Sequence, residues 1–136
     1  MALLNDIAAK LVSASVGTLG SSASTSATLF IGRMPNSPDA CVVLYEYSGF
    51  EPAQTFGTNA AAIRKPRVQI VCRGSRGDYA TPRSKAESAL SAIAGLSNQT
   101  VNGTNYLNIS LVSSPVPIDI DNQDRFLIAT NYEVWF

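Results

Sequence analysis

The residues that could perform chemistry are few, and they are not arranged for catalysis. The chain has 136 residues and no histidine, which removes the commonest general base together with the usual triads and zinc sites. Serine is abundant, but no histidine or matched lysine is present to activate it. Tyr79 and Lys85 are not spaced to place an acid and a base on one face of a helix. We therefore expect no catalytic residue and no enzymatic activity.

The acidic segment Asp119–Asp121 has the opening residues of a calcium-binding loop. Such a loop requires a glycine at its sixth position and an acid at its twelfth, and these are Asp124 and Thr130 here. Arg76–Asp78 spells an adhesion tripeptide, but its aspartate is better explained as a helix cap. No glycine-rich phosphate loop is present. We expect neither a bound metal ion nor a cofactor.

The two cysteines, Cys41 and Cys72, lie in apolar segments rich in β-forming residues. Two thiols are too few for a disulfide framework, so we expect both to be buried and free. A Cys41–Cys72 disulfide stays open as an alternative if their strands are neighbours in one sheet.

Charge is balanced overall but segregated along the chain. Ten Lys and Arg residues stand against ten Asp and Glu residues, and charged residues make up 15%, well below the typical quarter. Residues 1–60 have two basic against four acidic residues, residues 61–85 seven against one, and the remainder one against five. The basic segment could contact DNA through Arg67, Arg73 and Arg76, pair with acidic patches of identical subunits, or form ordinary surface charge. Low net charge favours association with other protein.

Residue patterning predicts a single α+β domain over residues 1–136, with one mixed or antiparallel sheet of about five or six strands and two helices. Apolar steps of three and four predict a helix over about residues 4–12, with Val12 on its apolar stripe and Asp6 off it. A second helix is predicted from Asp78 to about Ala94, ended by Gly95. Strands are expected at 29–32, 41–47, 67–73, 106–112 and 126–136, with a hairpin turn at Asn102-Gly103. The alternation of the 67–73 strand predicts that only the face with Val68, Ile70 and Cys72 is fully buried. In the 106–112 strand, Leu107, Ile109 and Leu111 are expected to point inward, and Pro115 and Pro117 are expected in a turn region.

Two longer segments are expected to lack regular structure. Residues 13–28 are almost entirely Ser, Thr, Ala and Gly, which predicts a flexible connector after the first helix. Residues 48–66 predict a long interaction loop, and its Phe50 and Phe56 are expected to dock on another copy of the protein. Folding back over the protein's own core is the alternative. Arg64, Lys65 and Trp135 are predicted to belong to the same subunit interface.

Several stretches together resemble the tail terminator or minor capsid (head–tail joining) proteins of long-tailed bacteriophages. The resemblance is carried by Phe30–Tyr47, Pro66–Gly74 and Asp78–Thr81, and by the strands around Tyr106 and Asn131–Glu133. It covers most of the chain, and its motifs are structural. No residue of such a protein performs chemistry, so the resemblance transfers no catalytic role.

The resemblance implies a virion structural protein that assembles as a ring, hexameric in such proteins, on the last ring of the tail tube. It would end tube polymerisation and join the tail to the head connector, with DNA passing through its lumen. The implied partners are further copies of the chain, the tail tube protein and the head connector or stopper protein, with no membrane. No signal peptide or membrane span is evident, so we expect synthesis in the host bacterial cytoplasm and a final place in the tail or neck of the virion.

Two other functions stay open at this point. A head-side stopper, a head completion protein or a tail-tube protein is the nearest alternative. A DNA-binding module that uses the basic segment 64–85 is an alternative of a different class.

Overall fold

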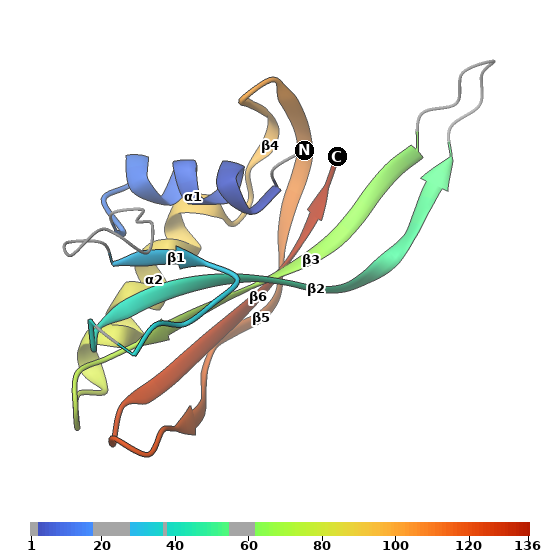
Figure 1. Ribbon diagram of the computed structural model, residues 1–136. Coiled ribbons are helices and arrows are strands. Elements are labelled where there is room, and N and C mark those ends of the chain that lie inside the picture. The colour runs from blue at the N-terminus through green and yellow to red at the C-terminus, as the bar shows by residue number, and fades with distance from the viewer. Residues whose placement is uncertain (1–2, 18–27, 37, 55–61) are drawn as a thin grey trace.

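The computed structural model of the chain describes residues 3–17, 28–36, 38–54 and 62–136, with the backbone alone at 48–54 and 62 (Figure 1). Within these residues the chain forms two helices and six strands. In chain order the elements are α1 (Leu3–Ser13), β1 (Leu29–Ile31), β2 (Cys41–Gln54), β3 (Ala62–Arg73), α2 (Ala80–Ile93), β4 (Ser97–Val101), β5 (Thr104–Ile120) and β6 (Phe126–Trp135).

The strands form one curled sheet in the order β1-β2-β3-β6-β5-β4. Strand β1 runs parallel to β2, and every other neighbouring pair is antiparallel. Both helices lie on the same side of this sheet (Figure 1). The prediction of an α+β fold with two helices and one mixed sheet of five or six strands is confirmed.

The main core lies between the helices and the sheet face that they cover. Val68, Ile70 and Cys72 of β3 are each 1% exposed, as the alternation of that strand predicted. The register places Val68 beside Tyr132 and Cys72 beside Ile128 on β6, and both of these partners are also fully buried. The two central strands therefore present one continuous apolar face to the helices.

The opposite face of β3 is also buried where that strand ends. Val71 and Arg73 are each 4% exposed, and Val43 beside Val71 on β2 is fully buried. The expectation that only one face of this strand is fully buried is therefore wrong at its C-terminal end. The segment from Pro35 to Asp39 supplies three carbonyl groups to the Arg73 guanidinium, so this segment lies against that end of the second face.

Helix α1 buries Leu3, Ile7 and Leu11 against the core. Val12 was expected on the same stripe but is 42% exposed, because it lies about 100° further round the helix than Leu11. Asp6 was expected off the stripe but is 3% exposed. A polar residue thus occupies the buried face of α1.

The first part of the predicted connector contains a buried residue. Val16 is 1% exposed, and a side chain at Gly17 would lie 3.1 Å from Thr28 Oγ1 and 3.3 Å from Leu29 Cβ. The start of the connector therefore packs beside its end, next to β1. Residues 18–27 lie outside the described residues, so the predicted flexibility of the connector stays a prediction.

Helix α2 is fixed at both ends by residues that the sequence singled out. The N–H of Thr81 donates to Asp78 Oδ1 at 3.2 Å, although the N-cap position itself is Tyr79. Gly95, directly after the helix, has φ +80°, the left-handed conformation that commonly ends a helix.

The long loop predicted over residues 48–66 is mostly strand. β2 continues to Gln54 and β3 begins at Ala62, so the two strands form a hairpin arm that extends away from the body (Figure 1). Pro52 and Pro66 had suggested loop, but register shifts interrupt the β2–β3 pairing on either side of Phe50, between Tyr47 and Ala53. Pro52 falls within this interrupted region, and Pro66 falls just before the β3–β6 ladder, which starts at Arg67. Prolines are tolerated at such irregular positions.

Strand β5 continues through the prolines that were expected in a turn. Pro115 and Pro117 lie inside it, and three register shifts separate its pairing with β6 into segments. The turn itself is shorter, and it is closed by hydrogen bonds between Asp121 and Arg125. Within the described residues the far side of this part of β5 has no strand partner, and prolines are tolerated at such edges and at register shifts.

Two inward positions expected for β5 differ in the structure. Ile109 is 2% exposed as predicted, but Leu111 is 40% exposed. Leu111 lies beside the first register shift and beyond the short strand β4, so little covers it. The hairpin turn from β4 to β5 is confirmed, with positive φ at both Asn102 and Gly103 as a two-residue hairpin turn requires.

Candidate functional site

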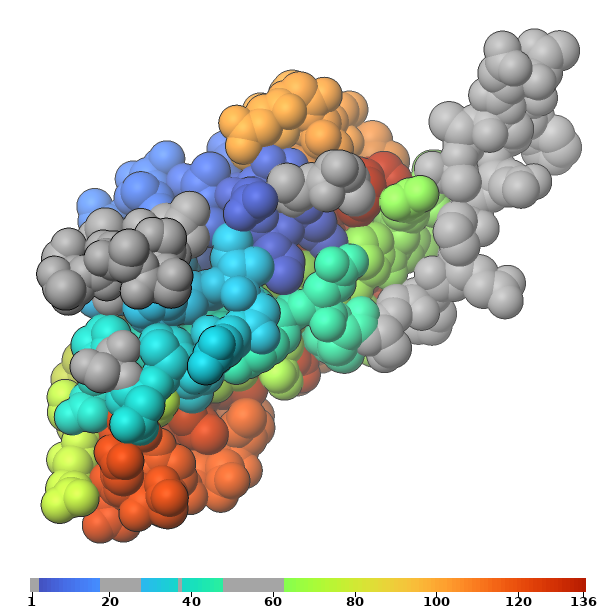
Figure 2. Space-filling view, in the orientation of Figure 1, coloured from blue at the N-terminus to red at the C-terminus, as the bar shows by residue number. Residues whose placement is uncertain are grey.

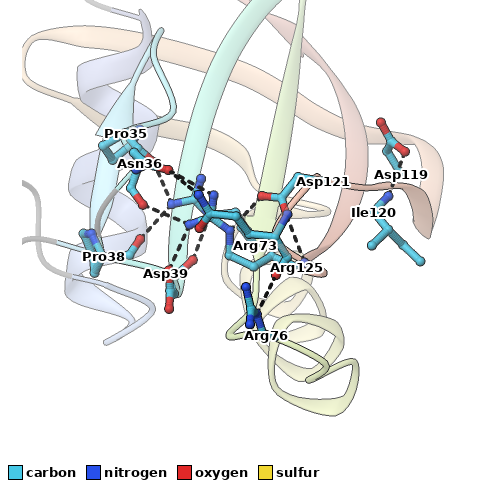
Figure 3. A network of polar contacts seen from close by, with 11 residues as sticks. Pro35, Asn36, Pro38, Asp39, Arg73, Arg76, Asp119, Ile120, Asp121 and Arg125 are labelled. Carbon is cyan, nitrogen blue, oxygen red and sulfur yellow. Dashed lines mark hydrogen bonds and ion pairs between the residues drawn. The ribbon is translucent and has the colours of Figure 1, made fainter.

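A polar cluster lies at the end of the sheet where β3 finishes and β6 starts (Figure 3). Arg73, the last residue of β3, donates from Nε to the carbonyl of Asp39 at 2.8 Å. Its Nη2 donates to the carbonyls of Pro35 at 2.6 Å and Pro38 at 2.7 Å. Charge-assisted hydrogen bonds of this kind are the stronger class in proteins. Arg73 therefore clamps the segment that connects β1 to β2.

Arg125 forms the second half of this cluster, directly before β6. It is 4% exposed, and its Nη1 lies 2.9 Å from both Asp39 Oδ1 and the carbonyl of Asn36. Its Nε donates to Asp121 Oδ2 at 2.7 Å. The sequence did not predict that Arg125 is buried or that it forms ion pairs. Asp39 lies 86 residues earlier in the chain, and nothing in the acidic turn indicates that Asp121 binds a buried partner.

The acidic turn is closed internally. Asp121 Oδ1 accepts the N–H groups of Gln123 at 2.9 Å and Arg125 at 3.0 Å. Partial burial opposes ionisation, but these N–H groups and the Arg125 guanidinium hold the pKa of Asp121 below its ordinary value. Within the described residues no group of three or more His, Cys, Asp or Glu side chains is placed to hold a metal ion. The carboxylate of Asp121 therefore stabilises the turn and the buried Arg125 side chain.

The three arginines expected to face DNA or a neighbouring subunit do not form one surface. The expectation for Arg73 is wrong, because it is buried and its guanidinium is held by backbone carbonyls. Arg67 lies 3.4 Å from Glu133 Oε2 on the neighbouring strand. Arg76 is exposed and donates to the carbonyl of Gln123 at 3.2 Å. The basic segment of the sequence is thus divided among different environments.

Three of the five predicted interface residues lie at the other end of the sheet, with Lys65 and Trp135 on one face and Arg64, which pairs with Phe136, on the other. Lys65 Nζ lies 4.6 Å from the ring centroid of Trp135, within the range of a cation–π interaction. Trp135 Nε1 donates to Glu133 Oε1 at 2.5 Å. Arg64 is exposed, and its backbone pairs with that of Phe136 in both directions.

The remaining two predicted interface residues are not placed. The side chain of Phe50 and the whole of Phe56 lie outside the described residues, so their role in subunit contact stays a prediction. Phe136, by contrast, packs against the core and makes an edge contact with Tyr106, with ring centroids 5.5 Å apart.

Helix α1 is tied to the β4–β5 hairpin by a buried carboxylate. Tyr106 Oη and Asn102 Nδ2, the latter at 2.8 Å, both donate to Asp6. Burial, followed by the hydrogen bond and the charge of Asp6, raises the pKa of Tyr106 above its ordinary value. The sequence gives no signal for this contact, because an aspartate in the first turn of a helix also suits the helix dipole in solvent.

The cysteines are free and buried, as predicted. Their strands are neighbours, but Cys41 lies opposite Arg73 and Cys72 lies opposite Val42, so the two side chains point to opposite faces of the sheet. Burial raises the pKa of both thiols, that of Cys72 to about 12. The alternative of a disulfide is therefore excluded by this register, and neither thiol is activated as a nucleophile.

Exposed apolar side chains follow one another along the second half of β5. Their exposed fractions are 40–51%. They are Leu111, Val112, Val116, Ile118 and Ile120, and we call them the β5 strip. Leu111 lies opposite Tyr132 and Val116 lies opposite Ala129. Because Tyr132 and Ala129 point to opposite faces of β6, the strip is divided between the two faces of the sheet. The second half of β5 and the β5–β6 turn form one end of the body in the space-filling view (Figure 2).

Residues 10–135 match the family described as bacteriophage tail terminator protein. The chain belongs to this family. The resemblance stated from the sequence is thereby confirmed. A chain in a solved structure of the virion of a native gene transfer agent (GTA) particle is similar in fold to this chain, with a TM-score of 0.65. That similarity covers 98% of this chain and 92% of that chain at 13% sequence identity. No curated protein matches the sequence.

Family membership identifies a structural protein of the phage tail, and the geometry agrees with such a role. The ionisable side chains Asp6, Arg73 and Arg125 are buried and held in contacts that connect elements of the fold. Neither α1 nor α2 combines the length and apolar composition needed to cross a bilayer. Among the described residues, the β5 strip and the Lys65–Trp135 pair are candidates for interaction, and the β2–β3 arm projects from the body (Figure 1).

Proposed function

We propose that this chain assembles as a ring, hexameric in the complete particle, that caps the tail tube and ends its polymerisation. The ring then joins the tail to the head connector, and DNA passes through its lumen. The observation that carries this proposal is the match to the tail terminator family over residues 10–135. The similarity of fold to a chain of a phage-like virion supports it.

The partners that follow from this function are further copies of the chain, the tail tube protein and the head connector or stopper protein. The protein is made in the host bacterial cytoplasm and ends in the tail or neck of the virion. The exposed apolar β5 strip and the projecting β2–β3 arm support repeated protein–protein contact. We propose that Arg64, Lys65 and Trp135, together with Phe50 and Phe56, belong to the contacts between subunits.

We propose no catalytic role. The buried carboxylate and guanidinium groups are used in structural contacts, and burial keeps the thiols of Cys41 and Cys72 protonated. Neither set provides the acid, base or nucleophile that a reaction requires.

A head-side stopper, a head completion protein or a tail-tube subunit is the nearest alternative, because such a protein would also contact copies of itself around a DNA channel. A dedicated DNA-binding module is less well supported. Arg73 is buried and Arg67 is paired with Glu133, so the sequence-predicted basic patch is not presented as a single surface.

The experiment is deletion of the gene in a phage that carries it, with electron microscopy of the particles. We expect tails of abnormal or variable length and heads without joined tails, and normal particles when the gene is supplied in trans. Tails of normal length joined to heads would contradict the terminator function. Labelling of the protein in intact particles separates the alternatives, since a stopper lies on the head side of the joint and a tube subunit lies along the whole tail.

A further inference from the structure

We draw no further inference here: the strongest candidate, the β5 strip along the part of β5 that has no outer strand partner within the described residues, is divided between the two faces of the sheet, and nothing in the structure shows what covers it.

Discussion

Replacement of Tyr106 by phenylalanine tests the buried contact that holds α1 to the sheet. The variant removes only the hydroxyl that donates to Asp6, and the ring keeps its edge contact with Phe136. Asp6 is 3% exposed, so solvent does not replace the lost donor, and Asn102 is left as its side-chain donor. Loss of one of its two side-chain hydrogen-bond donors leaves the buried carboxylate less well compensated for its desolvation, which destabilises the folded state.

The expected size of the effect follows from the charged acceptor. Hydrogen bonds to charged groups contribute about 1.5–3 kcal/mol, so we expect Y106F to lower the free energy of unfolding by about 2 kcal/mol. For a chain of this length that corresponds to a decrease of roughly 6–10 °C in Tm. Urea unfolding followed by circular dichroism gives the first number, and calorimetry gives the second.

The matched control is Y79F, because Tyr79 is 41% exposed and its ring also makes an edge contact, with Phe126. Y79F is expected to change stability by less than about 0.5 kcal/mol. Amide hydrogen exchange adds a local readout, since Y106F is expected to speed exchange in α1 more than in β3. A Y106F variant as stable as Y79F, with unchanged exchange in α1, would refute the role assigned to Asp6.

Two further predictions concern the buried arginine cluster and alkaline pH. R125M is expected to lower the free energy of unfolding, measured in urea, by about 2–4 kcal/mol, because it leaves Asp39 and Asp121 without their buried partner. The control R76M changes an exposed arginine and is expected to have little effect. Equal losses of stability in the two variants would contradict the structural role of the cluster. Burial raises the pKa of Cys72 from 9.0 to about 12. As the pH rises above about 9, the thiol is therefore deprotonated in the unfolded chain before it is deprotonated in the folded one, and the free energy of unfolding falls. The expected loss is about 2–3 kcal/mol between pH 9 and 11. Unfolding midpoints across this range check the slope, which C72A is expected to reduce.

Local sequence patterns were sufficient to predict the strands and turns whose pairing is regular. The alternation of Val68, Ile70 and Cys72 predicted the buried face of β3, and Asn102-Gly103 predicted the hairpin turn. These signals depend only on side-chain periodicity and on backbone conformations that few residues adopt. They do not depend on what the rest of the chain does.

The sequence could not predict features that depend on distant partners. Asp6 and Tyr106 are 100 residues apart, so the buried carboxylate of α1 resembles an ordinary polar position. The burial of Arg73 depends on a segment that lies 34 to 38 residues earlier in the chain. The prolines of β5 suggested a turn, because nothing local indicates that the outer edge of that strand has no partner.

The same reasoning applies to the candidate site. Arg64, Lys65 and Trp135 were grouped from their residue types; the structure brings Lys65 and Trp135 together because β3 and β6 are neighbours, whereas Arg64 lies beside Phe136 on the other face. Their role in subunit contact stays a prediction. The sequence did not predict the β5 strip, because Leu111 was assigned to an inward face and the segment around Pro115 and Pro117 to a turn. An exposed apolar strip at a sheet edge is recognisable only when the sheet order is known.

The placement of charges in the fold changes what the charge segregation of the sequence means. Arg73 is buried by the polar cluster at the turn end of the sheet, so the most concentrated basic stretch of the chain contributes less to the surface than its count implies. At that end Asp119 and Asp124 stay exposed, whereas Arg64 is exposed at the other. Arg76 is also exposed beside the β5–β6 turn, where it donates to the carbonyl of Gln123. The basic residues that first suggested a patch for DNA are therefore divided between the two ends of the sheet and mixed with acidic residues. This division weakens the case for one basic surface that binds a polyanion tightly.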